Sequence, residues 1–190
     1  MTQRTALCSA RVLWLSLVTA VTLLPGMSLA AGKLNETPAA TLQFDGTIIS
    51  ASCNVDNGSK SQNVSLGTFY TSDFPSKGTT TKAVPFDINL KGCTDNISGA
   101  RVSFTGATAE GDSTLLALTG AGTSGVASGL GVELLDKDMK IIPVNTTTDK
   151  YPLMPGDNNT LTFNLRYKST AATVMEGDAK ATLFFDMQYQ

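Results

Sequence analysis

The feature that most constrains the fold of this 190-residue chain is a series of short apolar runs, many of them alternating, between turn-forming residues. In the run ATLFFDMQYQ (181–190), Phe185, Met187 and Tyr189 alternate with mostly polar residues, a period of two that is typical of a half-buried strand. This punctuation predicts an all-β protein, most simply a β-sandwich. The other runs occupy 41–55, 62–69, 83–93, 100–107, 114–118, 129–136, 140–144 and 159–168.

Helical signals are weak. No window keeps apolar residues at three- and four-residue spacing over three turns, and one short turn is expected within TSDFPSKG (71–78). We expect the first core strand of the domain at residues 47–52.

Residues 1–30 differ in composition from the rest. Arg4 and Arg11 are their only charges, an apolar stretch follows, and small residues occupy positions near Ala30. This is the pattern of a secretory signal peptide, with cleavage after Ala30 or Ala31. The alternative is a transmembrane anchor, which needs roughly 20 apolar residues, whereas the uninterrupted stretch here has only about a dozen.

Export leaves two cysteines, Cys53 and Cys93, because Cys8 lies within the predicted signal peptide. An even pair in an oxidising compartment indicates a disulfide, and two free buried thiols are the alternative. Two cysteines in a chain without histidine make a zinc site implausible, and no loop has the ligand spacing of a calcium site. We therefore expect no metal and no cofactor.

Residues 31–43 (AGKLNETPAATLQ) carry few apolar side chains, so by themselves they cannot offset the entropy of their own ordering. We interpret them as an N-terminal extension that precedes a domain at 44–190. Ala40, Leu42 and Phe44 alternate with polar residues, but further back a glutamate and a proline share the face of Leu34. An extended segment with a few apolar side chains is suited to bind the edge of a sheet.

Composition argues against several classes of function. The net charge of −2 and the lack of a basic run disfavour a general electrostatic grip on nucleic acid. A chain without histidine lacks the commonest general base, and Asp136 and Asp138 are expected in a solvated turn, so we predict no enzyme. A secreted carbohydrate-binding module with a complete sandwich is the alternative, although the one tryptophan, Trp14, lies in the signal peptide.

Several segments, taken in order, resemble the pilin subunits of chaperone–usher fimbriae of the type 1 kind. They are the extension followed by FDGTIISASCNVD, a second cysteine after VPFDINLKGC, the hairpin-like GLGVELLDKDMKIIPV and the closing LFFDMQYQ. Tyr189 is second from the end and Gly177 fourteenth from the end, positions at which this family favours these residues. The resemblance covers the whole predicted mature chain.

The resemblance implies an incomplete immunoglobulin-like β-sandwich that lacks its final strand and has an N-terminal donor-strand extension. In that scheme a periplasmic chaperone lends a strand to the open groove, and at an outer-membrane usher the extension of the next subunit replaces it. The chain would then be a structural subunit of an adhesive fimbria, exported through the periplasm to the surface of a Gram-negative bacterium. Its partners would be the chaperone, the usher and neighbouring subunits.

Residue by residue, the resemblance implies a disulfide between Cys53 and Cys93. It assigns pairing with chaperone and donor to the C-terminal strand, here represented by Gly177, Leu183, Phe185, Met187 and Tyr189. The side chains inserted by the extension would be Leu34, Ala40 and Leu42, with Phe44 near the strand boundary.

Overall fold

The structure is a computed structural model that describes residues 50–190, and these residues form short and medium-length strands with little helix. The helical elements are α1 (Asn57–Lys60) and the 3₁₀ turn Thr71–Asp73. The strands are β1 (Asn54–Val55), β2 (Val84–Lys91), β3 (Gly99–Thr105), β4 (Thr108–Ala109), β5 (Asp112–Leu116), β6 (Leu130–Asp136), β7 (Thr146–Thr147), β8 (Tyr151–Pro152), β9 (Asn159–Ser169) and β10 (Phe184–Tyr189).

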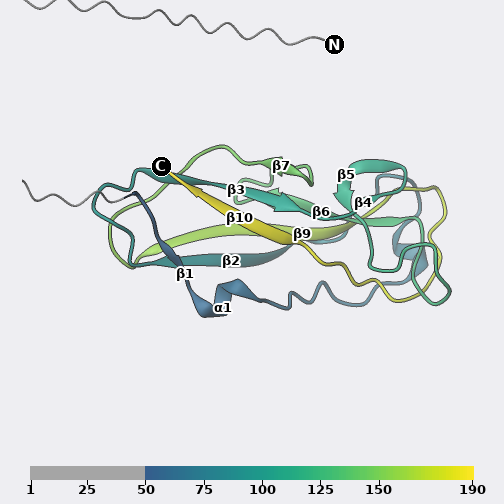
Figure 1. Cartoon of the computed structure of the whole chain (residues 1–190). Coiled ribbons are helices and arrows are strands. Elements are labelled where there is room, and N and C mark those ends of the chain that lie inside the picture. Colours follow the sequence, from purple (N-terminus) through teal and green to yellow (C-terminus); the bar gives the residue numbers. More distant parts are fainter. Residues whose placement is uncertain (1–49) are drawn as a thin grey trace, which may run out of the picture. The chain divides into compact units, whose positions relative to one another are not determined.

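The strands form two antiparallel sheets (Figure 1). The larger sheet has the order β1-β2-β9-β6-β5-β4. The smaller sheet has the order β10-β3-β7, and β8 pairs with β3 beside β7. β3 therefore has neighbours on both edges, whereas β10 has one described neighbour. The result is an immunoglobulin-like β-sandwich that lacks a strand beside β10.

The core lies between the two sheets because the strands alternate. In β9, Leu161 and Phe163 point inward and are buried, and the alternating Thr160 and Thr162 point outward. The ring of Phe163 packs edge-on against Phe104 of the smaller sheet, with 4.9 Å between ring centroids. Fully burying a side chain of this size contributes about 3 kcal/mol, so this contact is a principal tie between the sheets.

One end of the sandwich carries the disulfide, and we call it the disulfide end (residues 50–53, 92–99, 152–157 and 189–190). Cys53 and Cys93 are joined, which confirms the predicted bridge. The backbone N–H of Thr94 donates to the Ser52 carbonyl at 3.0 Å, and Cys93 and Gly156 exchange a pair of backbone hydrogen bonds. The described chain thus enters the domain at the same end at which β10 finishes.

The opposite end is built from loops, and we call it the loop end (residues 70–79, 119–129 and 170–178). Backbone hydrogen bonds tie these loops to the last residues of β9, for example from Gly78 N–H to the Ser169 carbonyl at 2.9 Å. A second apolar cluster fills the sandwich here, and includes Phe74, Val132, Tyr167 and Val174. β9 therefore runs the full length of the domain, from the disulfide end to the loop end.

The structure departs from the sequence-based expectations at three places. Within the described part of the predicted strand at 47–52, residues 50–52 form no strand, and β1 begins at Asn54 instead. The run 62–69 is not a strand, because it has no described partner to pair with. Asp56 caps a short helix, α1, where no helix was expected, and its side chain accepts from the Gly58 N–H at 3.0 Å.

The other elements lie close to the predicted runs. The expected short turn within 71–78 is the 3₁₀ turn, and the hairpin expected at 129–144 forms from β6 and a return segment bridged through Leu135 and Ile141. Between residues 50 and 190 the structure contains no helix with the length and apolar character needed to cross a membrane.

Candidate functional site

The candidate site is the open edge of β10, and the side chains that face the core define it. Phe185, Met187 and Tyr189 face the core and pack against it, yet all three are only partly buried. Their counterparts on β3, for example Val102 and Phe104, are fully buried. The core therefore stays partly open to solvent along β10.

The backbone of β10 has an open edge along the same residues. Gln190 and Gly99 exchange both backbone hydrogen bonds, which fixes the phase of the antiparallel ladder. Because bonded and non-bonded pairs alternate, the N–H and C=O groups of Phe185, Met187 and Tyr189 point away from β3. None of these groups has a described partner, and unpaired strand edges of this kind recruit another strand.

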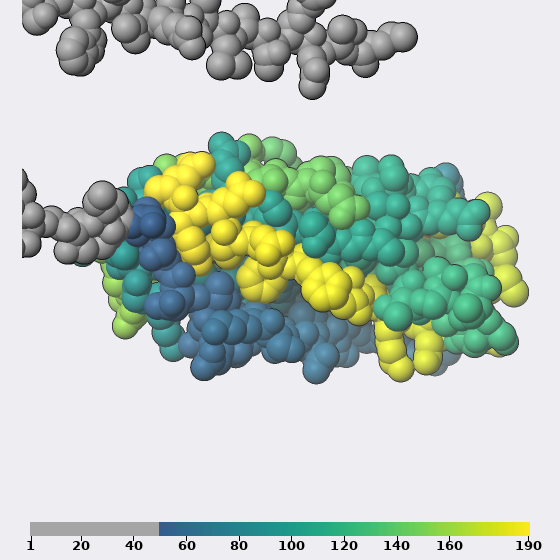
Figure 2. All heavy atoms as spheres, in the orientation of Figure 1, coloured from purple at the N-terminus to yellow at the C-terminus, as the bar shows by residue number. Residues whose placement is uncertain are grey.

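The segment 61–69 faces β10 across the opening (Figure 2). It leaves α1 beside β2, where the Gln62 side chain donates to the Asp87 carbonyl at 2.7 Å. It reaches the loop end at Phe69, whose ring packs edge-on against Tyr167. Between these anchors, residues 62–69 make no backbone–backbone hydrogen bond with any described residue. The opening therefore has two strand-like rims, and neither rim is paired toward the gap.

Between the two rims lies a groove of about 1760 Å³. Its floor is apolar and half-buried, because side chains of both sheets reach it without being covered. The charged residues among its lining include Lys60, Lys180 and Asp186. The apolar lining residues that are only partly buried include Leu66, Phe69, Phe86, Leu165, Leu183, Phe185 and Met187. An extended chain with alternating apolar side chains matches this shape and chemistry.

Two tyrosines report how far the groove and its neighbourhood are desolvated. Burial raises the pKa of the Tyr167 phenol, whose hydroxyl donates to the Ala179 carbonyl at the loop end of the groove. Burial also raises the pKa of Tyr189 at the other end of β10. Both phenols are therefore neutral near pH 7.

Gly177 lies outside β10, on the chain that leads into it. Its backbone passes the loop at 125–127 so closely that a Cβ would lie 2.5 Å from the Ala127 nitrogen, and its φ of +154° is also rare for other residues. Hydrogen bonds join Asp178 to Gly125 and to Ala127 on either side of this approach. Gly177 thus positions the strand leading to the groove, rather than lining β10 itself.

The structure brings together the predicted residues of the C-terminal strand and leaves others outside its reach. Leu183 precedes β10 and lines the groove with Phe185 and Met187, while Tyr189 packs at the disulfide end. The predicted donor residues and the predicted cleavage residues lie outside the described residues; they are Leu34, Ala40, Leu42, Phe44, Ala30 and Ala31. Sequence reasoning missed the second rim, although the alternation of 62–69 was its signal.

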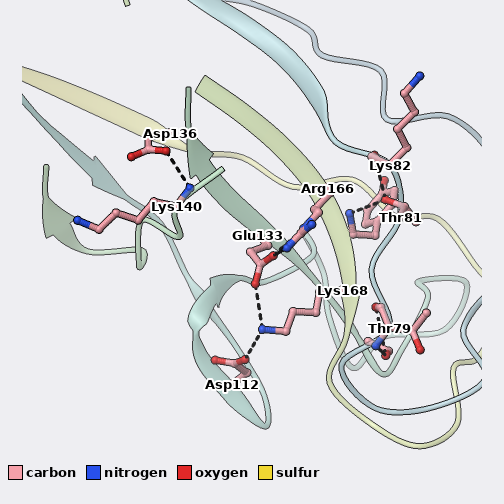
Figure 3. Close-up of polar contacts among 11 residues, drawn as sticks. Thr79, Thr81, Lys82, Asp112, Glu133, Asp136, Lys140, Arg166 and Lys168 are labelled. Atoms are coloured by element: carbon pink, nitrogen blue, oxygen red, sulfur yellow. Dashed lines mark hydrogen bonds and ion pairs between the residues drawn. The ribbon is translucent and has the colours of Figure 1, made fainter. Parts of the chain in front are cut away.

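A buried charged cluster on the outer face of the larger sheet is a separate feature (Figure 3). Glu133 is 1% exposed, and its carboxylate pairs with Arg166 at 2.6 Å and with Lys168 at 2.9 Å. Asp112 lies 3.5 Å from the same ammonium group. The hydrogen bond that Lys168 donates to Glu133 is the main cause of the raised pKa of Lys168. The cluster is internally satisfied and has the character of a structural tie between β5, β6 and β9.

Comparison with known proteins identifies the family. The family model described as "Fimbrial protein" matches residues 42–190. The chain is 41% identical to the uncharacterized fimbrial-like protein YcbU of Escherichia coli K12, over 79% of this chain and 84% of the relative. It is 36% identical to the fimbrial subunit type 1 of Salmonella typhimurium, over 85% of this chain and 90% of the relative.

The fold has a counterpart among solved structures. A subunit in a structure of a chaperone–usher pilus superposes with a TM-score of 0.62 at 23% sequence identity, over 81% of this chain and 97% of that one. The chain belongs to the fimbrial protein family, and it is a structural subunit of a surface fimbrium of Gram-negative bacteria. The family is one of structural proteins, and the match does not favour a carbohydrate-binding module.

Proposed function

We propose that this subunit polymerises by strand exchange in the groove beside β10. A periplasmic chaperone first supplies an extended strand, and at an outer-membrane usher the 31–43 extension of a neighbouring subunit takes its place. The single observation that carries the proposal is the open edge of β10, where apolar side chains are half-buried and the adjoining backbone groups have no partner among the described residues. A strand in the groove would cover these apolar side chains and would also form hydrogen bonds with these backbone groups.

The chaperone step follows from the exposed edge. A newly exported subunit would present an unpaired strand above an open apolar groove, and such surfaces aggregate. The predicted signal peptide at 1–30 and the disulfide between Cys53 and Cys93 are consistent with passage through an oxidising periplasm. The family match supports the same route, because its members include fimbrial subunits.

The direction of the inserted strand follows from the two ends of the domain. The chain enters its own domain at the disulfide end. In a donor subunit, the disulfide end of the domain therefore follows the C-terminal end of the extension. β10 runs toward the disulfide end. An antiparallel donor therefore finishes at the loop end of the acceptor, and the donor's domain sits beyond that end. This head-to-tail contact is heterologous and repeats without closing, which builds a filament.

The extension matches the groove in its side chains. Leu42 and Leu34 would enter the apolar floor, and burying each side chain contributes about 1.5–3 kcal/mol. Ala40 suits a place where the floor is shallow, and Phe44 ends the inserted segment. A glutamate and a proline lie on the same face as Leu34.

A self-complemented variant tests the proposal. Residues 31–44 are moved from the N-terminus to follow Gln190 through a short turn, since a hairpin loop of two to five residues permits antiparallel pairing with β10. We expect the melting temperature to rise by about 10 °C or more, because a shift of 1 kcal/mol corresponds to about 2–4 °C at this chain length. The variant should also remain monomeric.

The matched control carries Leu42→Asp in the moved segment, which should bring the melting temperature back toward that of the uncomplemented chain. Equal melting temperatures for the complemented protein, the control and the chain without any extension would show that the domain is already complete. The strand-exchange proposal would then be wrong.

A further inference from the structure

We propose that, within the polymer, the loop end of each subunit binds the disulfide end of the next, in addition to the strand in the groove. The contact joins Tyr70 and Met175 on the loop end to Met154, in the 153–157 loop, on the disulfide end. The partner is a second copy of this chain. This inference rests on the proposed function, and it deepens that function by naming a second interface between neighbours.

Exposed apolar side chains mark both surfaces. The side chain of Tyr70 is 78% exposed and that of Met175 is 65% exposed, both at the loop end. Met154 is 68% exposed at the disulfide end. Tyr70 and Met175 also border the end of the groove, so the surface they form is continuous with the place where an inserted strand would finish.

The backbone presents these side chains in fixed positions. Buried Asn159 accepts from the Met154 N–H at 2.8 Å and donates to the Met154 carbonyl at 2.7 Å. At the other end, Asp73 accepts from the Tyr70 N–H at 2.8 Å and returns a backbone hydrogen bond to the Tyr70 carbonyl at 3.0 Å. A preorganised backbone lowers the entropic cost of forming a contact.

The connection between the inserted segment and the donor's domain is short, so it holds the two surfaces close together. If the inserted segment ends at Phe44, residues 45–52 connect it to Cys53 of the donor, and a fully extended connection spans at most about 30 Å. β9 alone, which spans the domain, measures about 37 Å for its 11 residues. The donor can therefore approach the acceptor's loop end with its disulfide end but not with its own loop end.

A cysteine pair tests the contact. The full chain with Tyr70→Cys and Met154→Cys is assembled, imaged by electron microscopy, oxidised mildly and then boiled in detergent without reductant. We expect a ladder of covalent multimers that reductant collapses to monomer. The control pair is Tyr70→Cys with Met139→Cys, because Met139 is 46% exposed on the turn that follows β6 and lies outside the 153–157 loop that forms the proposed contact; it should give monomer.

A second pair, Met175→Cys with Met154→Cys, repeats the test from another residue of the loop end, so a folding defect at Tyr70 does not decide the result. Polymers that are visible by microscopy but fall apart to monomer for both pairs would overturn this contact and leave strand exchange standing. Covalent dimers from the Tyr70→Cys variant alone would also overturn it, because they would place loop end against loop end. Failure of the native chain to polymerise would instead contradict the proposed function.

Discussion

Two strands of this domain have similar alternation in sequence and very different surroundings. β9 pairs with β2 on one edge and β6 on the other, and its inward residue Phe163 has no exposed surface. Among residues 50–190, β10 pairs with β3 alone, and its inward residues Phe185 and Met187 are half-buried. Side-chain pattern alone therefore specifies which face of a strand is apolar, whereas the presence of a neighbour decides whether that face is covered.

The comparison is tested most strongly by truncating one inward phenylalanine on each strand. Phe163→Ala should lower the free energy of unfolding by about 3–5 kcal/mol, because the cavity lies in a closed core. Phe185→Ala should cost only about 1–2 kcal/mol in the uncomplemented chain, since its ring is already partly in water. Denaturant unfolding of both variants measures the difference.

The self-complemented chain sharpens this test. Filling the groove should raise the cost of Phe185→Ala toward about 3 kcal/mol and leave the cost of Phe163→Ala unchanged. Equal costs for Phe185→Ala with and without the added strand would show that nothing covers the β10 face, and the contrast between the strands would lose its explanation.

The disulfide should stabilise the domain in either state of the groove. Cys53 and Cys93 are 40 residues apart, and the chain-entropy model assigns a bridge of this span about 4 kcal/mol. We expect Cys53→Ser to lower the melting temperature sharply and to reduce the periplasmic yield. The doubly substituted chain, with Cys93→Ser added, controls for the reactivity of a lone thiol. Unchanged melting and yield would show that the bridge has no structural role.

Local pattern was sufficient to predict most of the longer strands and the disulfide. The alternation in β9 and β10 and the pairing of Cys53 with Cys93 were predictable because each depends on side-chain period or on composition. The region from 50 to 69 was predicted less well. A strand is defined by its partner, and 62–69 alternates without a described one. The short helix α1 depends on a single cap by Asp56.

The site was predictable only in its C-terminal half. Phe185 and Met187 could be identified from alternation and family resemblance, but the opposite rim required the tertiary position of 61–69 beside β10. The exposed side chains of Tyr70 and Met154 were likewise unpredictable, because exposure at the ends of a sandwich depends on loop conformation. The role of Gly177 needed the close approach to the 125–127 backbone.

The charged cluster on the larger sheet provides a test with a smaller expected effect on stability. Glu133→Gln removes the anion between Arg166 and Lys168 and should cost about 2 kcal/mol, which is within the range for hydrogen bonds to charged groups. Both cations keep some access to water, which limits the loss. The cost should be the same in the open and the self-complemented chain, as measured by denaturant unfolding. A cost that changes when the groove is filled would mean that the two sheets are coupled more tightly than the contacts indicate.

The smallest expected effect is a pH dependence of stability that arises at the edge of β3 that pairs with β8. Tyr151 of β8 packs edge-on against Phe163, and burial, followed by the charges of Asp136 and Asp149, raises the pKa of its phenol to about 12. In the unfolded chain the same phenol ionises near pH 10. Between these values the folded chain holds more protons than the unfolded chain, so stability is complete below pH 10 and falls as the pH rises toward 12.

Tyr151→Phe should remove part of this alkaline loss, and the ultraviolet absorbance of tyrosinate in the folded protein should lose its latest-titrating component. Tyr167 and Tyr189 also have raised pKa values, so a residual loss should persist. Because Tyr151 lies across β3 from the groove, adding the complementing strand should leave its titration in place. A Tyr151 titration that moves when the groove is filled would contradict the view that only the β10 edge of this sheet is incomplete.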